Sequence, residues 1–545
     1  MPTYKTPGVF VEEKSTLPPS VAEVSTAVPA FIGYTEKHPD GSSPVVARIN
    51  TLLEYEQIFG GPQLTAFAIE VAQDGNLILT KGESGKDAGA VPRFLLHYQL
   101  SHYFKNGGGT CYIVSVGSYK ADPAKGAIID GLNRLELEDE PTLILLTDAV
   151  SLDKGDYHEV CQAALLQCQK LGDRFAILDV KRNGDTNTDD VGAFRDELGM
   201  RALAYGAAYY PYLETTLTYA YQESGVTVPG PLYRRQLGAN TVLVTYANKV
   251  DDTPQVILAP DDKADRVSFA VKDRTLTITF KDQSGAAVVA AWNTWTLGNS
   301  NAAGFGIVQA GSGSGRLAPK KDTLPMSRGL AALQSLDTAL YSQIKSLLAT
   351  QRVTLPPSGA IAGIYASTDR ERGVWKAPAN VSISAVIGPV QKISDDAQKD
   401  LNVDVNSGKS INAIRSFAGK GTLVWGARTL AGNDNEWRYV SVRRLFIMIE
   451  ESARKSTAFA VFEPNDLTTW LKVKGMIDSF LYGLWERGAL AGAKPDQAYF
   501  VNVGLGKTMT PQDILEGRMN VEIGIAAVRP AEFIILRFSH KLQEA

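Results

Sequence analysis

The stretch FEPNDLTTWLKVKGMIDSFLYGLWERGALAG, residues 462–492, carries the clearest helix signal in the chain. Asn465 or Asp466 stands where an N-cap is expected, and Gly488 follows the periodic segment as a stop. Between them, apolar residues recur at three- and four-residue steps: Trp470, Val473, Ile477, Phe480, Leu481 and Leu484. The opposite side is charged, with Lys472, Asp478 and Glu486, and with Lys474 near its margin. The pattern predicts a helix that packs on one face and presents a polar surface on the other.

Further motifs lie on both sides of this stretch. Downstream comes RPAEFIILRF (529–538), and upstream come GTLVWGARTL (421–430) and the paired arginines of SVRRLFIMIEES (441–452). Two more motifs lie nearer the N-terminus, YKTPGVFVEE (4–13) and LPPSGAIAGIYASTDRERGVWKAPAN (355–380). In this order, and together with FEPND and GALAG, the motifs resemble those of the contractile tail sheath proteins. These proteins form the outer sheath of contractile phage tails and of related bacterial injection particles, and the resemblance brackets nearly the whole chain.

The composition is that of an ordinary globular protein with several domains. The chain has 545 residues, more than one hydrophobic core holds, and we expect about three or four domains. Hydrophobic residues make up 44% and charged residues 21%, which indicates neither a disordered nor a fibrous chain. With 55 Lys and Arg against 59 Asp and Glu, the net charge of −4 gives no global attraction to nucleic acid. We therefore expect no nucleic-acid partner.

The cysteines and the N-terminal sequence favour folding in the cytoplasm. Cys111, Cys161 and Cys168 are sparse and odd in number, so we expect reduced thiols rather than a disulfide framework. The first residues, MPTYKTPGVFVEEK, lack the basic region and apolar core of a secretory signal. No segment reaches about 18 uninterrupted apolar residues, the length that predicts a spanning helix. We therefore expect no direct membrane insertion.

The predicted fold class is α/β, in the sense of an α+β multidomain chain with four parts. Residues 26–224 alternate apolar runs (AFIGY, CYIVSV, PTLILLTD, FAILDV) with helical patterns and predict a middle α/β domain. Residues 225–325 contain short strand-like runs and predict a β-rich outer insert: VLVTY, QVILA, RVSFAV, TLTITF and AVVAAWNTW. Residues 326–545 return to alternating helices and strands and predict a C-terminal α/β sheath domain, which the N-terminal arm completes.

The two ends of the chain have the pattern of strands that pair with a sheet edge outside their own segment. Residues 1–25 place VFVEE between prolines and predict an extended arm that requires a sheet edge, either in its own chain or in a neighbouring subunit. The resemblance favours the neighbour. At the other end, PAEFIILRFSH predicts a last strand that begins at Pro530 and is donated in the same way.

Motifs for catalysis or metal binding are incomplete. VNVGLGKT (501–508) ends like a phosphate-binding loop, but Val501 stands where that motif requires glycine. DTNTDD (185–190) alternates oxygen ligands like a calcium loop, yet Asp190 replaces the turn glycine and Asp196 the closing glutamate. The histidines form no HExxH pair. We predict a chain that is not an enzyme and that uses no cofactor or metal.

The resemblance implies a contractile sheath subunit that polymerises as stacked hexameric rings around an inner tube. Contraction of the sheath drives the tube through a target envelope. The implied partners are other copies of this chain, the inner tube protein, and baseplate and tail terminator or cap proteins. Such a particle is assembled in the bacterial cytoplasm, as part of a phage virion or of a contractile injection particle, and is extracellular after lysis or retained in the cell. The alternatives are a non-contractile baseplate or adhesin component and a P-loop-like NTPase.

The same resemblance places candidate interaction residues in the two arms and in the helix of residues 462–492. The arm residues implied to contact other subunits are Val9, Phe10, Val11, Glu12, Glu13, Ile534, Leu536 and Phe538. The hinges are expected beside the arms, at Pro18, Pro19 and Pro530. Lys472 and Lys474 are candidates to face the tube, where acidic residues of the tube protein would pair with them.

Overall fold

The computed structural model describes residues 21–39, 43–71, 77–81, 93–182, 189–228, 233–238, 240–246, 254–299, 302, 304–318, 322–325, 330, 333–334 and 338–535. The chain divides into two compact units. The first unit consists of Met1–Pro62, Arg93–Thr215 and Thr354–Ala545, and the second of Gln63–Pro92 and Thr216–Val353. Residues 63–92 therefore group with the second unit, whereas the division expected from the sequence places them in the middle domain.

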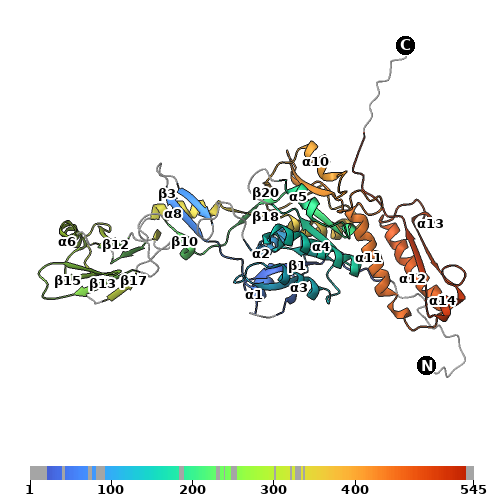
Figure 1. The fold of residues 1–545 in the computed structure, drawn as a ribbon, viewed down its shortest axis with the longest axis horizontal. Helices are drawn as coiled ribbons and strands as arrows, with labels where there is room; N and C mark the ends of the chain where they lie inside the picture. The colour runs from blue at the N-terminus through green and yellow to red at the C-terminus, as the bar shows by residue number, and fades with distance from the viewer. Residues whose placement is uncertain are drawn as a thin grey trace, which may run out of the picture. The chain divides into compact units, whose positions relative to one another are not determined.

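A nine-stranded mixed sheet forms the centre of the first unit (Figure 1). Its order is β19-β22-β21-β8-β7-β6-β1-β5-β2, and the strands from β21 to β5 run parallel to one another. The apolar runs expected to be buried strands are β1, β5, β6 and β7, near the middle of this order, as their continuous hydrophobicity predicts. The strand bounds are β1 Pro29–Thr35, β2 Val45–Ile49, β5 Cys111–Ser118, β6 Leu143–Leu146, β7 Phe175–Asp179, β8 Gly206–Tyr210, β19 Val381–Ser382, β20 Val386–Pro389, β21 Ile411–Phe417, β22 Gly421–Val424, β23 Tyr499–Val503 and β24 Val521–Ile525.

Helices cover both faces of the large sheet. Because successive strand residues point to opposite faces, Ala30 and Ile32 of β1 pack with α3 and α4, whereas Phe31 packs on the other face with α2 and α9. The mixed α/β multidomain class predicted from the sequence is confirmed. The helix bounds in this unit are α1 Leu52–Phe59, α2 Leu96–Lys105, α3 Lys125–Leu135, α4 Lys154–Leu171, α5 Asp190–Glu197, α9 Ser358–Arg372, α10 Asp395–Asn402, α11 Val440–Ser456, α12 Leu467–Glu486, α13 Pro495–Ala498 and α14 Pro511–Leu515.

The helix predicted from residues 462–492 is α12. Its N-cap is Asp466, which accepts a hydrogen bond from the Thr469 amide at 2.9 Å, and Gly488 follows the helix with a φ of +80°. The predicted stripe, Trp470, Val473, Ile477, Phe480, Leu481 and Leu484, is buried throughout. From Val473 onward it packs with α11 and with the β23–β24 hairpin in a second hydrophobic core. The prediction for this helix is confirmed.

Helix α11 contributes to two hydrophobic cores of the first unit. Val440 and Ile447 pack with the large sheet, whereas Leu445, Met448 and Ile449 pack with α12 and the hairpin. The spacing of these residues places the two sets on different sides of one helix. Figure 1 shows α11 beside α12, with the hairpin helices α13 and α14 beyond.

The second unit contains small sheets of short strands. Its sheets have the orders β10-β3-β4, β11-β12-β16 and β14-β15-β13-β17. Its own hydrophobic core contains Phe280, Trp292 and Phe305. The element bounds are β3 Phe67–Val71, β4 Leu77–Lys81, β10 Val226–Thr227, β11 Tyr233–Gln236, β12 Val242–Tyr246, β13 Gln255–Pro260, β14 Ser268–Lys272, β15 Thr275–Phe280, α6 Gly285–Gly298, β16 Phe305–Gln309, β17 Asp322–Pro325 and α8 Thr338–Ala349. Strands β9 (Leu213–Thr218) and β18 (Arg352–Leu355) contain the points where the chain passes from one unit to the other.

One strand prediction for the insert is wrong. The run AVVAAWNTW lies in helix α6, not in a strand. Ser284 is its N-cap, and its buried residues Val288 and Trp292 stand four apart, as a helix face requires. A short apolar run without polar alternation does not distinguish a helix from a buried strand. The other four strand-like runs are β12 to β15.

A buried carboxyl group joins two layers of the first unit at the end of β7. Asp179 Oδ1 accepts the Ser358 amide at 2.8 Å, and its Oδ2 lies 2.6 Å from Ser358 Oγ. The same hydroxyl is 2.8 Å from Gln99 Oε1, and Gln99 Nε2 donates to the Thr147 carbonyl at 3.3 Å. The Ser358 hydroxyl has one hydrogen, so it cannot donate to both Gln99 Oε1 and Asp179 Oδ2. It donates to Gln99 only if Asp179 is protonated and donates its own hydrogen to Ser358 Oγ. Burial also raises the pKa of Asp179 from 3.8 to about 7.

Replacing Asp179 with asparagine should remove one source of alkaline destabilisation. The folded pKa exceeds the unfolded one, so this carboxyl favours the folded state most below about pH 4 and loses that contribution as the pH rises to about 7. An amide keeps the acceptor for Ser358 N–H and supplies a permanent donor to its hydroxyl. We expect Asp179→Asn to match the wild type at pH 4 and to exceed it at pH 8, by at most about 4 kcal/mol.

Urea denaturation at the two pH values measures this difference. Asp148, buried with its pKa also raised to about 7, is present in both proteins and so cancels. The neighbouring Tyr157, Cys161 and Tyr212 have pKa values raised by burial and stay neutral over this range. An equal stability difference at pH 4 and pH 8 would show that folding does not raise the pKa of Asp179.

Within the described residues, no helix has the combination of length and apolar character that a membrane span requires. In that same part of the chain, no three His, Cys, Asp or Glu side chains are grouped so as to hold a metal ion.

Candidate subunit-interaction surface

The β23–β24 hairpin forms a small antiparallel sheet on α12. Tyr499 pairs with Ile525 at one end and Val503 with Val521 at the other. Val501 and Val503 are buried, whereas Phe500 on the outer face is 48% exposed. Within the described residues this sheet has only these two strands, so each strand has an outer edge without a neighbour. Such edges bind further strands, and a sheet gains independent stability from a third strand.

The C-terminal segment after the hairpin carries exposed apolar side chains. Residues 531–535 adopt no regular secondary structure. Phe533, Ile534 and Ile535 are 72%, 80% and 76% exposed, respectively. Burying each side chain fully would contribute about 1.5–3 kcal/mol. Three consecutive exposed residues of this size are typical of a segment that binds another surface.

Within this segment, Glu532 is hydrogen-bonded to the rest of the first unit. Glu532 accepts hydrogen bonds from Arg428 Nε at 2.8 Å and from Arg428 Nη2 at 2.5 Å, and the Tyr439 hydroxyl donates to it at 3.3 Å. Arg428 is 4% exposed and Glu532 20%. This carboxylate raises the pKa of Arg428. The segment also borders a cavity of about 550 Å³ that Trp425 helps to line.

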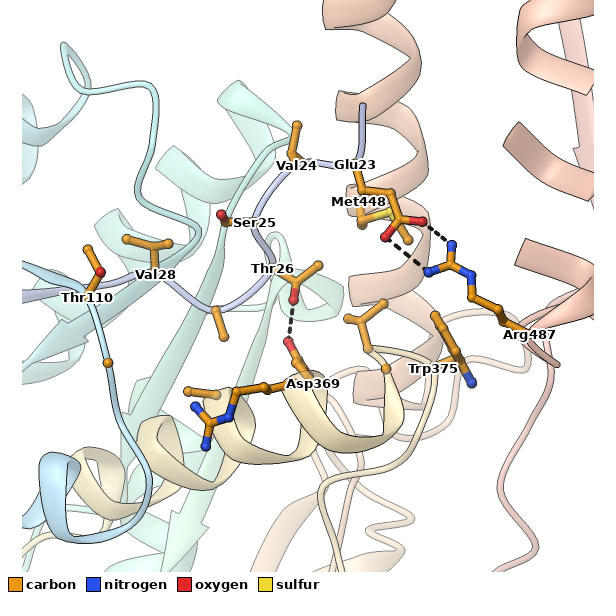
Figure 2. Close-up of a pocket in the computed structure, with 16 residues that line it drawn as sticks. Glu23, Val24, Ser25, Thr26, Val28, Thr110, Asp369, Trp375, Met448 and Arg487 are labelled. Carbon is orange, nitrogen blue, oxygen red and sulfur yellow. Dashed lines mark hydrogen bonds and ion pairs between the residues drawn. The ribbon is translucent and has the colours of Figure 1, made fainter. Parts of the chain in front are cut away.

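The first described residues form a second anchored segment (Figure 2). Val21 is buried in the core of α11 and α12, and the Val24 amide donates to Ser452 Oγ at 3.1 Å. Thr26 is held twice, because its hydroxyl donates to Asp369 Oδ2 at 2.6 Å and its carbonyl accepts from Arg444 Nη2 at 2.8 Å. Figure 2 shows this segment along one side of a cavity of about 350 Å³.

Arg444 joins this segment to the body of the first unit. It forms a bidentate pair with Asp369, at 3.0 Å and 2.5 Å, and its guanidinium lies 4.5 Å from the centre of the Tyr365 ring. Arg444 and Asp369 are 3% and 7% exposed. Farther out, Glu23 pairs with Arg487 across an exposed surface, as Figure 2 shows.

Comparison with known proteins gives a consistent result. Residues 432–541 match the phage tail sheath C-terminal domain. The tail sheath protein of Vibrio phage KVP40 is 27% identical over 187 residues, 34% of this chain and 26% of that protein, so the match spans about a quarter of this relative. The contracted sheath complex of the extracellular contractile injection system PVC is 25% identical, with a TM-score of 0.56 over 99% of each chain. Two structures of the anti-feeding prophage, its contracted helical sheath and its six-fold symmetrised baseplate, are 26% identical, with TM-scores of 0.54 over 99% of this chain and 100% of theirs.

The chain is similar to contractile tail sheath proteins of phages and of phage-tail-like injection systems, as its motifs predicted. The matched proteins are sheath proteins, which agrees with the sheath subunit predicted from the sequence. The fold resemblance extends over both units of the chain.

The structure of the sheath subunit distinguishes the two candidate tube-facing lysines. Lys472 is exposed on α12. The Lys474 ammonium donates to the Val501 carbonyl at 2.7 Å and pairs with Asp478 at 3.2 Å. Lys474 is therefore engaged by its own hairpin, whereas Lys472 projects from the helix.

The GKT segment of the sheath subunit is the connection between β23 and α14. The amides of Lys507, Thr508 and Met509 all donate to the Gly504 carbonyl, at 3.2 Å, 3.0 Å and 3.2 Å. The Gly506 amide donates to the Met509 carbonyl at 2.9 Å. A phosphate-binding loop requires such amides to point at the ligand. These amides are already bonded, so the geometry gives the NTPase alternative no support.

The remaining sequence candidates have structural roles or lie outside the described residues. Asp189 caps α5 by accepting the Gly192 amide at 2.7 Å. The three cysteines are free and buried. Ile534 is exposed, and Pro530 lies in the same C-terminal segment. The remaining arm and hinge candidates lie outside the described residues: Val9, Phe10, Val11, Glu12, Glu13, Pro18, Pro19, Leu536 and Phe538. Sequence reasoning did not pair Arg428 with Glu532 or Arg444 with Asp369, although all four residues lie in the quoted motifs.

Proposed function

We propose that this sheath subunit polymerises as stacked hexameric rings around an inner tube and contracts to drive the tube through a target envelope. The observation that carries the proposal is the two-stranded hairpin, which has no third strand within the described residues, together with the exposed apolar side chains of residues 533–535. The similarity to contracted sheaths of injection systems supports the same proposal. Head-to-tail contacts that do not close generate a helix, which is the symmetry a sheath needs.

The proposed joints are donated strands. Residues 9–13 and residues 534–538 add to the hairpin edges of neighbouring subunits, where backbone hydrogen bonds give affinity and alternate side chains give register. Exposed Phe533, Ile534 and Ile535 support this for the C-terminal arm. Because strand pairing survives rigid-body rotation, the subunits stay connected while the outer parts of the sheath rearrange. No nucleotide is consumed in this scheme.

The proposed arrangement assigns a role to each part of the chain. Residues 1–25 form the donated arm, and residues 326–545 form the core domain that surrounds the tube. Residues 26–224 form a middle domain, and residues 225–325 form an insert on the outside of the sheath. The grouping of 63–92 with 216–353 suggests that the outer part begins earlier in the chain than residue 225.

The proposed partners are other copies of the chain, an inner tube protein, and baseplate and tail terminator proteins. The chain would be part of a phage tail or of an extracellular contractile injection particle, assembled in the bacterial cytoplasm. Neither nucleic acid nor a membrane enters this proposal.

Lys472 is the proposed contact with an acidic tube surface, and Lys474 a secondary one. An exposed ion pair contributes about 0.2–1 kcal/mol, and each subunit of a ring would contribute one such pair. We expect Lys472→Glu to reduce co-sedimentation of assembled sheath with tube at low salt. Lys420→Glu, the same charge change at an exposed residue of the β21–β22 turn, is the control. Equal tube binding by both variants would remove Lys472 from the tube interface.

Negative-stain electron microscopy of the concentrated full-length protein tests the proposed function. Hollow, cross-striated cylinders are the expected result, with the tube protein added if the sheath subunit requires a template. Discrete oligomers under both conditions would contradict it and favour the non-contractile baseplate or adhesin alternative.

A further inference from the structure

Two buried arginines bind segments near the two ends of the described chain. At the N-terminal end, Arg444 binds the Thr26 carbonyl and Asp369. At the C-terminal end, Arg428 binds Glu532 through two nitrogens. These arginines are 3% and 4% exposed, so each contact is formed inside the subunit and not on its surface.

Side-chain exposure changes sharply along the chain at the C-terminal contact. Upstream, Arg529 Nη1 donates to the Asn435 carbonyl at 2.8 Å, so the chain is held on both sides of Pro530. Glu532 is only 20% exposed, whereas the next residue, Phe533, is 72% exposed. Side-chain exposure therefore rises abruptly after Glu532, although Phe533 and Ile534 still border the same cavity as Glu532.

Arg428 is well suited to hold this point. Besides Glu532, it donates to the Asn402 carbonyl at 3.2 Å and to the Gly432 carbonyl at 3.5 Å. These carbonyls fix the guanidinium plane before the carboxylate binds. A planar guanidinium that binds a carboxylate through two parallel bonds fixes direction as well as position.

We propose that Glu532 is the positioning residue of the C-terminal arm: bound by Arg428 and Tyr439, it fixes where the arm leaves the subunit, and the arm turns from Phe533 onward. This places the hinge after Glu532 and not at Pro530. The inference rests on the proposed function, because an arm that reaches a neighbouring hairpin must start from a fixed point.

The residue from which the arm starts affects assembly, because it sets how much conformational entropy the arm loses when it binds a neighbouring subunit. A strand that leaves from one position samples a smaller volume than one freed over several more residues, so its effective concentration at the neighbouring edge is higher. Loss of the Glu532 contact frees the chain back to the contact of Arg529. The folded body changes little, since Arg428 keeps its two backbone acceptors.

Distance distributions between two spin labels test the anchor directly. Nitroxide labels at Ile535→Cys and Lys420→Cys report the position of the arm relative to the β21–β22 turn. The native cysteines are buried and burial raises their pKa values, so they do not compete for label. In the full-length protein, diluted with unlabelled chains, we expect Glu532→Gln to broaden the distribution at least twofold.

Two further variants separate positioning from general damage. Asp395→Asn alters an exposed carboxylate that pairs with Arg415 in the same cavity, and it should leave the width unchanged. Tyr439→Phe removes one donor to Glu532 and should broaden the distribution less than Glu532→Gln does. Equal widths for wild type and Glu532→Gln, at matched thermal stability, would overturn the proposal.

Cylinder formation provides a second measurement, in which failure of the anchor and failure of the proposed function give different results. We expect Glu532→Gln to form fewer and shorter cylinders than the wild type at a temperature where both monomers are fully folded. Absence of cylinders from the wild type contradicts the proposed function while the label distances still decide the anchor. Wild-type lengths from the variant contradict the anchor alone.

Discussion

Removal of residues 1–20 is expected to abolish polymerisation and leave a soluble monomer. The deletion ends just before the segment that the body holds, because Val21 is buried and Thr26 is bound by Arg444. The folded unit therefore keeps its core, while every proposed N-terminal strand contact is lost. Sedimentation velocity and electron microscopy, at a concentration where the full-length chain forms cylinders, measure the result. We expect complete loss of cylinders rather than a modest shortening.

A replacement variant provides the matched control for this deletion. Residues 1–20 exchanged for a Gly/Ser segment of equal length keep the chain length but not the capacity to form a strand. This variant should behave like the deletion. Long, regular sheaths from either protein would reject strand donation by the N-terminal arm. Unfolding of the deletion variant would instead show that residues 1–20 support their own subunit.

The second large effect is expected from Arg444→Ala. This substitution leaves the Asp369 carboxylate buried without its bidentate partner and removes the contact with the Thr26 carbonyl. Breaking a buried ion pair from one side costs about 3–5 kcal/mol. Urea denaturation of the monomer should register a loss of this size. Such a loss is a large fraction of the stability of an ordinary domain.

Arg487→Ala is the control for Arg444→Ala because it acts on the same N-terminal segment. Its pair with Glu23 is exposed on both sides, at 47% and 41%, and such pairs contribute about 0–1 kcal/mol. If both variants lost the same stability, the difference in burial would not determine the strength of these contacts.

Local sequence signals predicted elements that are determined locally. Helix α12 followed from an N-cap and a periodic stripe, and the central strands followed from continuous apolar runs. Helix α6 was missed because its apolar run also suits a strand, and only packing against the neighbouring sheet decides between the two. The grouping of residues 63–92 with 216–353 is not visible in the sequence, because a chain can leave a compact unit and return without a change in composition.

The anchors of the arms were not predictable in the same way. Glu532 lies 104 residues from Arg428, and Asp369 lies 75 residues from Arg444. From a single sequence, each of these charged residues is interpreted as an ordinary solvated side chain. The motifs that contain them were visible, but the pairing of an arginine with a distant carboxylate depends on the fold that brings them together. Lys472 and Lys474 show the converse, since two lysines of the same predicted helix, two residues apart, differ in their actual contacts.

The position of α11 between two cores has a consequence for a subunit that is pulled from both ends. Leu445 and Met448 belong to the core of the hairpin, and Val440 and Ile447 to the core of the large sheet. This helix contributes to the core of the hairpin and to the core on the α2 and α9 face of the large sheet, so these two parts should unfold in a single cooperative step. Tension between neighbours is then either withstood by both parts together or released by their joint unfolding.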